Sequence, residues 1–292
     1  MRLAFLGSPT SWYLADLRRA GGARTEIEPV PFSALRSVVS EGELDVLAGE
    51  TSLRAFDAVL VRTMLPASLE QVVFRMDALA ALAQSGTPVI NPPKAIEGAV
   101  DKYLTTCRLQ QAGLLTPKTY ACQRADDAMA AFAELGQDVV LKPIFGGEGR
   151  GITRLTDEAL ALRAFKLLEN LDAVFYIQQF IPHEGYDIRI LLVGDQVAAI
   201  RRHNPLDWRT NVARGGKAEP HDPTPEQLQM AFAASEVVGT LVAGVDLLPG
   251  RDGRLYAIEV NAVPGWQALS RATSLDIARQ LLDWIASTYR IG

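Results

Sequence analysis

The sequence predicts a mixed α/β protein with more than one structural unit, and three observations support this. The chain has 292 residues, which is long enough for about two domains. Its composition, 48% hydrophobic and 22% charged, supports ordinary buried cores. Apolar strand-like runs alternate with segments of helical periodicity from residue 2 onward. Strands and helices are therefore expected to alternate.

The N-terminal unit is expected to span residues 1–97. An apolar run that breaks at Gly7 predicts the first buried strand. Apolar residues recur every three or four positions from Leu69 to Ala83, so this segment predicts a helix that buries Leu69 and Val73 on one face. The expected elements are strands at 2–6, 27–30 and 58–61 and helices at 12–20 and 69–83, and residues 88–90 are expected to end the unit. Asn91-Pro92-Pro93 is expected to be a linker.

A middle unit is expected over residues 98–174. Ala112-Gly113 and Pro117 end its first helix. The expected elements are helices at 102–111, 125–135 and 157–169 and a strand at 138–141.

The third unit is expected over residues 175–292. A polar stretch, residues 204–225, predicts a long functional loop within it. The expected elements are strands at 173–177, 188–193, 196–200, 244–246 and 255–261, and helices at 225–241 and 277–289.

The run Leu255 to Asn261 carries a candidate metal site. Side chains two apart on a strand share a face, so Glu259 and Asn261 are expected to point together, with Tyr256, Ile258 and Val260 on the other face. Carboxylate and amide oxygens are ligands that Mg²⁺ accepts, and Asp246 supplies another carboxylate. The alternative is that these residues form strand-end ion pairs or caps.

A glycine-rich loop follows Lys142 and leads to a strand-like segment at 152–154, so it predicts a hairpin flap. This spacing fits neither the P-loop nor the dinucleotide fingerprint. Gly146, Gly147 and Gly149 would let the backbone approach phosphate oxygens, and Lys142 would supply charge. The alternative is a glycine-rich hairpin with incidental charges.

Asp187 and Arg189 share one strand face, and Arg202 lies on the next predicted strand. These charges predict either a cross-strand ion pair or a guanidinium fork for a substrate carboxylate.

Composition also excludes some functions. A net charge of −5 and a pI near 5.4 argue against a general nucleic-acid surface. The two cysteines match no metal or redox spacing, and no leader or long apolar run indicates a membrane protein. A cytoplasmic protein is therefore expected.

The motifs, taken in chain order, resemble the ATP-grasp superfamily from about Asp101 to the C-terminus. The stretches 185–189, 208–211 and 259–265 are similar to its RimK-like group, which attaches amino acids to carboxylates. Residues 69–77, 89–97 and 144–152 resemble the archaeal tetrahydromethanopterin glutamate ligases. Two positions depart from the pattern: Gln179 stands where the family usually has Glu, and Ala268 where it commonly has Gly.

The resemblance implies an ATP-grasp fold behind an N-terminal Rossmann-like domain, and it implies a role for each motif. Two Mg²⁺ or Mn²⁺ ions would be held by Asp246, Glu259 and Asn261. Arg189, Arg202 and Asn211 would face the substrates. ATP would be held by Lys102, Lys142, Gly146, Gly147, Gly149, Gln178, Gln179, Phe180, Ile181 and Asp187.

The implied activity is ADP-forming ligation of an amino acid, expected to be L-glutamate, to an acceptor carboxylate on a pterin coenzyme. The alternatives are a ligase for a protein C-terminus or carrier protein, a dipeptide ligase, and a nucleotide-binding regulatory protein that does not turn over. The expected partners are small molecules, without nucleic acid or membrane, and a homo-oligomer is possible.

Overall fold

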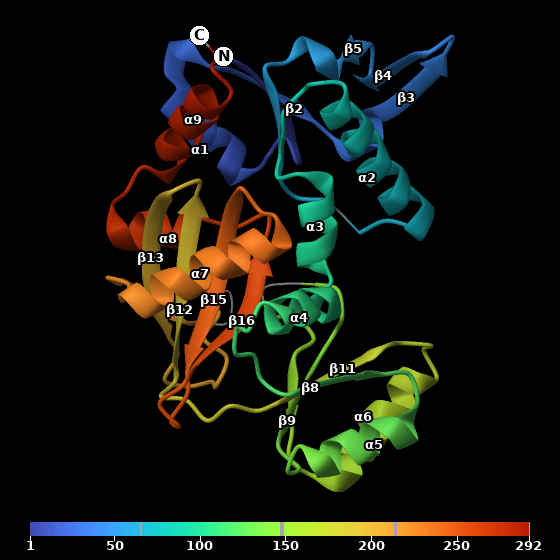
Figure 1. The fold of residues 1–292 in the computed structure, drawn as a ribbon, viewed down its shortest axis with the longest axis vertical. Coiled ribbons are helices and arrows are strands. Elements are labelled where there is room, and N and C mark those ends of the chain that lie inside the picture. Colours follow the sequence, from blue (N-terminus) through green and yellow to red (C-terminus); the bar gives the residue numbers. More distant parts are fainter. Residues whose placement is uncertain (65, 147–148, 213–214, 292) are drawn as a thin grey trace.

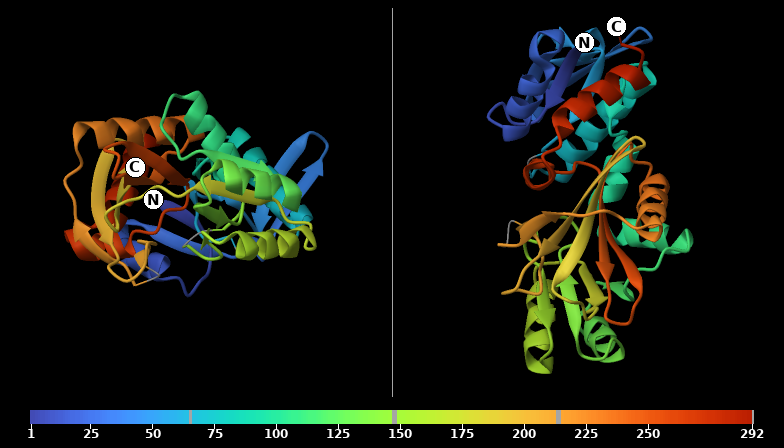
Figure 2. Two further views of the ribbon diagram at one scale, coloured as in Figure 1. Left: turned by 90° about the horizontal axis from the view of Figure 1, so that it is seen from below. Right: turned by 90° about the vertical axis from the view of Figure 1, so that its left-hand side faces the viewer.

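The computed structural model describes residues 1–64, 66–146, 149–212 and 215–291. An N-terminal α/β unit lies at one end of the molecule, a small middle unit at the other, and a C-terminal sheet with its helices between them (Figures 1 and 2). The mixed α/β class predicted from the sequence is confirmed. No described helix is both long and apolar enough to cross a bilayer.

A parallel sheet forms the centre of the N-terminal unit, in the strand order β2-β1-β6-β7. Its strands are Arg2–Leu6 (β1), Glu26–Val30 (β2), Ala58–Val61 (β6) and Val89–Ile90 (β7). The helices of this part of the chain are Trp12–Gly21 (α1), Leu69–Gln84 (α2) and Pro93–Val100 (α3). Single 3₁₀ turns lie at Gly22–Arg24, Phe32–Ala34 and Leu53–Ala55.

A second sheet in this unit was not predicted. Leu35–Ser40 (β3), Glu43–Ala48 (β4) and Thr51–Ser52 (β5) pair antiparallel. Much of β3 and β4 is exposed, with Val39 78% accessible, so the strands carry no continuous apolar run that a sequence pattern would reveal.

The α2 helix forms as predicted, but the expected burial of Leu69 and Val73 is wrong. These side chains are 79% and 49% exposed, whereas Met76, Leu79 and Leu82 are buried. The difference arises because the core contacts only the second half of α2.

The middle unit is an antiparallel sheet, β10-β9-β11-β8, with two helices and a hydrophobic core of its own. Its elements are Thr119–Cys122 (β8), Ala125–Glu134 (α5), Val139–Lys142 (β9), Thr153–Leu155 (β10), Glu158–Glu169 (α6) and Phe175–Gln179 (β11). β9 and β10 form the predicted hairpin around the glycine loop.

Two elements pair or pack differently from what the predicted unit boundaries imply. The strand expected at 173–177 is β11, which pairs with β8 and β9 and does not begin the third unit. Helix Lys102–Gln111 (α4) contacts the C-terminal unit, and its Leu109 lies in the core shared with that unit. We therefore propose that the middle unit runs from β8 to β11.

The C-terminal unit is a five-stranded antiparallel sheet in the order β14-β13-β12-β15-β16. Its strands are Tyr186–Val193 (β12), Gln196–His203 (β13), Lys217–Pro220 (β14), Val242–Pro249 (β15) and Leu255–Asn261 (β16), and its helices are Pro225–Val238 (α7), Gln267–Thr273 (α8) and Ile277–Thr288 (α9). β14 lies inside the stretch expected to be a loop. α7 ends earlier than predicted because Gly239 adopts a left-handed conformation and caps it.

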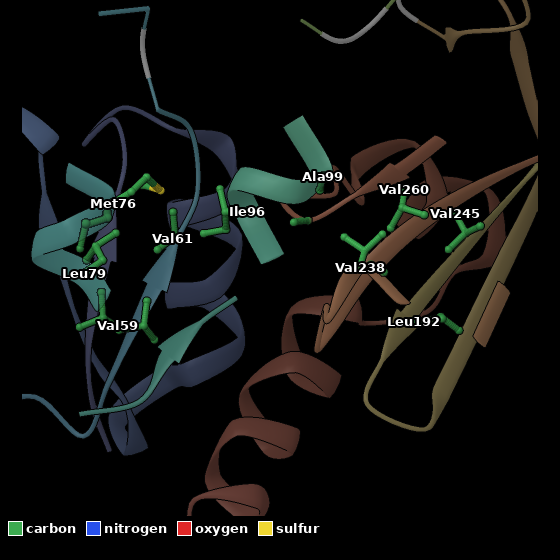
Figure 3. Packing of buried hydrophobic residues seen from close by; sticks show 14 of the residues in the cluster. Val59, Val61, Met76, Leu79, Ile96, Ala99, Leu192, Val238, Val245 and Val260 are labelled. Atoms are coloured by element: carbon green, nitrogen blue, oxygen red, sulfur yellow. The ribbon is translucent and has the colours of Figure 1, made fainter. Parts of the chain in front are cut away.

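The N-terminal and C-terminal units share continuous cores. Ile96 and Ala99 of α3 lie between the side chains of the parallel sheet and those of α7 and the antiparallel sheet, as Figure 3 shows. On the other side, α9 packs beside α1, where the two chain termini also meet (Figure 1). These two units therefore form one body, and the middle unit is attached to it.

Asn91, which the sequence places in a linker, is a buried residue that joins the two sheets. Its side chain is 1% exposed. Nδ2 donates hydrogen bonds to the carbonyls of Val242 (2.6 Å) and Ala262 (2.5 Å), and Oδ1 accepts from the amides of Leu241 (2.6 Å) and Val242 (2.9 Å). All four hydrogen-bonding positions of the side-chain amide are filled.

Asn91→Ala should lower the free energy of unfolding by about 2–4 kcal/mol, because it leaves buried backbone groups without partners. Urea denaturation measures the loss, with Asn170→Ala at the exposed end of α6 as the matched control. A change below about 0.5 kcal/mol would contradict this role.

Candidate active site

One face of the C-terminal sheet is apolar along half its length and charged along the other half. On β12, Leu191 and Val193 face the core beneath α8 and α9, while Asp187 and Arg189 continue the same face beyond it. On β13, Ile200 lies in that core and Arg202 beyond it. Alternation along the strands therefore places the charged groups together, and the predicted shared face of Asp187 and Arg189 is confirmed.

The charged groups lie directly opposite one another across the strands. Asp187 pairs in register with Arg202, Arg189 with Asp246, and Asp246 with Glu259. The guanidinium of Arg202 donates to Asp187 at 2.7 and 2.6 Å and contacts Asp246 at 2.9 Å. Arg189 contacts both oxygens of Asp246 at 3.1 and 3.2 Å. The cross-strand ion pairs considered from the sequence are present.

Asp246 is a buried carboxylate stabilised by these arginines. Burial raises its pKa, but Arg189 and Arg202 outweigh burial and hold the pKa of Asp246 below its ordinary value. Gly244 leaves room for the Arg189 side chain beside Asp246, since a Cβ at position 244 would lie 2.6 Å from Nη2 of Arg189 and 3.0 Å from Pro264. Any larger residue would displace the guanidinium.

Glu259 differs from its neighbours. Among the described residues it makes no hydrogen bond or ion pair within bonding distance. Burial raises the pKa of Glu259, and the charge of Asp246 adds to this, whereas Lys102, Arg189 and Lys142 oppose it. Within the described residues, Glu259 is therefore the carboxylate of this cluster that no lysine or arginine side chain contacts at ion-pair distance.

A β-bulge sets the direction of the Glu259 side chain. The register shifts between Asp246 and Leu247, which pair with Glu259 and Ala257 and leave Ile258 as the extra residue. The prediction that Tyr256, Ile258 and Val260 share a face is therefore wrong. Val260 lies in the core, while Ile258 lines a cavity with Glu259.

The residues predicted to bind a metal fit a hard cation. Asp246 and Glu259 are register partners, and Asn261 follows two residues later on β16. Oδ1 of Asn261 accepts a hydrogen bond from the amide of Val263 (2.8 Å), which fixes the side chain. No group of three or more His, Cys, Asp or Glu within the described ranges forms another candidate site.

Two lysines approach the same cluster from the middle unit and α4. Lys142, at the end of β9, donates to Oε1 of Gln178 at 2.6 Å, and Lys102 donates to the carbonyl of Gly146 at 2.5 Å. Burial lowers the pKa of the Lys142 amine to about 8, with Glu259 opposing this shift and Lys102 adding to it. Burial also lowers the pKa of Lys102.

The remaining predicted residues lie around these lysines. Gln178 is buried and also donates to Thr119 (3.0 Å), whereas Gln179 is exposed. Gly146 and Gly149 lie in the hairpin loop with positive φ. Gly147 falls outside the described residues. Thr210, which the prediction did not single out, donates to Asp187 at 2.6 Å.

Three cavities meet at Glu259. The lysine cavity is lined by Lys102, Lys142, Gln178 to Ile181, Asp187, Asn211 and Glu259. The apolar cavity, of about 380 Å³, is lined by Val61, Met64, Val72, Met76, Ile96, Glu259 and others. The arginine cavity, of about 290 Å³, is lined by Arg62, Arg189, Arg202, Asn211, Glu259 and Asn261 among others. A larger cavity of about 490 Å³ beside α4 includes Gln179 but not Glu259.

Arg62 is a site residue that the sequence reasoning missed. It lines both the apolar and the arginine cavities. The available signal was its position directly after the buried strand β6, since ligands bind at the carboxyl ends of parallel strands.

A model of the RimK-like ATP-grasp domain matches residues 99–285. The chain is 32% identical to the tetrahydromethanopterin:alpha-L-glutamate ligase of Methanococcus maripaludis, with 97% of each chain covered. It is 32% identical to the ribosomal protein bS6–L-glutamate ligase of Escherichia coli O139:H28, with 79% of this chain and 76% of that protein covered.

A solved structure of the ATP-grasp ligase PsnB, complexed with minimal precursor, Mg and ADP, superposes with a TM-score of 0.76. It shares 22% identity, and 98% of this chain and 97% of that chain are covered. At this identity the likeness shows a common fold.

Binding of a nonhydrolysable ATP analogue should weaken roughly tenfold between about pH 7 and about pH 9, because the Lys142 amine loses its proton near pH 8. Calorimetric titration at each pH measures this. Lys142→Arg should remove most of the dependence, since a guanidinium stays charged. Equal wild-type affinity at both pH values would contradict the role of Lys142.

Proposed function

The chain belongs to the RimK-like ATP-grasp ligases, and from this premise we propose that it joins L-glutamate to a carboxylate of a small pterin-type acceptor. Membership makes it an enzyme that forms a carbon–nitrogen amide bond, and ligases of this fold use ATP and Mg²⁺. The identity of the acceptor, the identity of the amino acid and the binding of two Mg²⁺ or Mn²⁺ ions are what we propose.

The observation that carries the proposal is that three separate cavities include Glu259. A ligase of this kind must bring a nucleotide, an acceptor carboxylate and an amine to one point. The lysine cavity offers two ammonium groups for phosphates, and the other two cavities remain for the acceptor and the amino acid. One centre reached from three sides suits a three-substrate reaction.

The chemistry requires activation of the acceptor. A carboxylate does not accept an amine at neutral pH, because its oxygen is a poor leaving group. The acceptor oxygen attacks the γ-phosphorus of ATP, the bond to ADP breaks, and an acyl phosphate forms. The amine of glutamate then attacks the acyl carbon, and inorganic phosphate leaves.

The protein contributes charge and position. Lys102 and Lys142 would neutralise the phosphates, and Gln178 would hold Lys142 in place through its 2.6 Å hydrogen bond. Asp246, Glu259 and Asn261 would hold Mg²⁺, which supplies Lewis-acid stabilisation of phosphate charge when it is bound. The glycine hairpin would cover the acyl phosphate and exclude water.

Roles for Asp187, Arg189, Arg202 and Asn211 follow from the same placement. Asp187 lines the lysine cavity and would contact the nucleotide sugar in addition to its ion pair with Arg202. Arg189 lines the arginine cavity, and Arg202 and Asn211 line both this cavity and the lysine cavity. We propose that they face the substrates at the point where the acyl group is transferred.

A small acceptor is favoured by two findings. The likeness to the Methanococcus maripaludis ligase extends through the N-terminal unit, outside the ATP-grasp match. That unit supplies most of the apolar cavity, which would accommodate a compact ring system. The likeness to the bS6 ligase makes a protein acceptor the second candidate.

Incubation with ATP, Mg²⁺, L-glutamate and a tetrahydromethanopterin-type acceptor should add one glutamyl residue, about 129 Da by mass, to the pterin. Glu259→Gln should slow ADP formation on the order of 100-fold, because it removes the unpaired carboxylate at the meeting point of the cavities. Glu226→Gln, on the exposed start of α7, is the matched control and should retain full activity.

Glutamylation of a protein terminus in cell extract, with no reaction on the pterin, would favour the second candidate. Near-wild-type turnover by Glu259→Gln at subsaturating Mg²⁺ would contradict the metal assignment.

A further inference from the structure

Arg62 is a buried arginine with no acidic partner. Its side chain follows β6 and is 4% exposed. Nη2 donates one hydrogen bond, 2.9 Å to the carbonyl of Pro264, and Nε has no hydrogen-bond partner. Among the described residues no carboxylate forms an ion pair with it. A buried cation without a counter-ion is costly, so its presence indicates a ligand.

The surroundings of Arg62 hold the guanidinium in a fixed position. Its Cζ lies 4.6 Å from the ring centre of Tyr13 and 4.5 Å from that of Trp266. The two rings meet edge to face at 4.7 Å, and Nε1 of Trp266 donates to Asp16 at 2.9 Å. An aromatic clamp of this kind directs the guanidinium without neutralising its charge. Burial lowers the pKa of Arg62 to about 10, so it remains charged at neutral pH.

The position of Arg62 relates it to the proposed reaction centre. It donates to Pro264, three residues after Asn261 in the turn that follows β16. It also lines the arginine cavity with Arg189, Arg202 and Glu259. Arg62 comes from the N-terminal unit, whereas the other three come from the C-terminal sheet, so the cavity is completed only where the units meet.

The arginines of this cavity differ in whether their charge is free. Arg189 is paired with Asp246, and Arg202 with Asp187 and Asp246. Arg62 is therefore the arginine of this cavity whose charge is available to an anion, within the part of the chain that the structure describes. A planar guanidinium suits a carboxylate, which it binds through two parallel hydrogen bonds.

We propose that Arg62 binds a carboxylate of the amino acid whose amine is ligated, and that the arginine cavity is the amino-acid site. This inference rests on the proposed function, because it presumes that one of the three cavities receives an amino acid. The arginine cavity is small, and charged and amide side chains make up about half of the residues that line it, which suits a compact charged molecule. The neighbouring cavity is mainly apolar and suits the body of an acceptor.

The test measures binding, so it does not depend on the acceptor. Calorimetry with Mg²⁺ and a nonhydrolysable ATP analogue would give the affinity for L-glutamate. Arg62→Gln should weaken glutamate binding on the order of 30-fold, because a charged hydrogen-bond pair is lost. Arg62→Lys keeps the positive charge but not the two parallel hydrogen-bond donors of the guanidinium, and should cause a smaller loss of glutamate affinity. Affinity for the ATP analogue should stay within about twofold of wild type in both variants.

A matched control is Arg201→Gln. Arg201 also stacks on an aromatic ring, with Cζ 3.8 Å from the centre of Tyr186, and its Nε also lacks a partner. It is not among the residues that line the arginine or apolar cavity. This variant should bind glutamate as the wild type does. Thermal unfolding of each variant shows whether the clamp has collapsed.

Two analogues identify the contact directly. L-Glutamine lacks the side-chain carboxylate and L-isoglutamine lacks the α-carboxylate. One of them should bind the wild type much more weakly than glutamate does, and this difference should disappear in Arg62→Gln.

The inference is overturned if Arg62→Gln binds glutamate within about threefold of wild type. It is also overturned if the ratio of glutamate affinity to analogue affinity is the same in the variant as in the wild type for both analogues. An equal loss of ATP-analogue affinity would assign Arg62 a structural role instead. If the wild type binds the ATP analogue but not glutamate, the proposed amino acid is wrong, and the same comparison applies to whichever amino acid it does bind.

Discussion

The site depends on the pairing of two carboxylates with two arginines across three neighbouring strands. Asp187, Arg202, Asp246 and Arg189 neutralise one another where the sheet leaves its apolar core. Removing one member would leave a buried charge unpaired, at a cost of about 3–5 kcal/mol. Because these groups satisfy one another, Glu259 and Arg62 are left with charges that the protein does not match. Substrates and a cation are the groups that can match them.

The division of the molecule into a large body and a small unit follows from its cores. The N-terminal and C-terminal units share two clusters, and Asn91 connects their sheets with four hydrogen bonds. The middle unit has a separate cluster and brings Lys142 and the glycine hairpin to the cavities. The apolar and arginine cavities are therefore built mainly from the large body, whereas the side chains that we propose to bind the nucleotide come partly from the small unit.

Many of the helices and strands could be predicted from the sequence, because the spacing of apolar residues and the positions of glycine and proline are local features. The end of helix α4, strand β16 and the β9–β10 hairpin follow directly from apolar runs and from the positions of glycine and proline. The bulge at Ile258 could not be predicted, since it depends on the partner strand, and it places Ile258 on a different face from Val260. Nor could the pairing of β11 with β8, or the convergence of Arg62 on a C-terminal sheet about 200 residues away in the chain. Long-range contacts decide these features.

The central claim is that an acceptor carboxylate is phosphorylated where the three cavities meet. The most direct measurement uses an acceptor whose carboxylate oxygens are labelled with ¹⁸O. If an acyl phosphate forms and the amine displaces phosphate, each amide formed should release one inorganic phosphate that carries one ¹⁸O atom. Unlabelled phosphate, with amide still formed and ATP converted to ADP, would contradict the account.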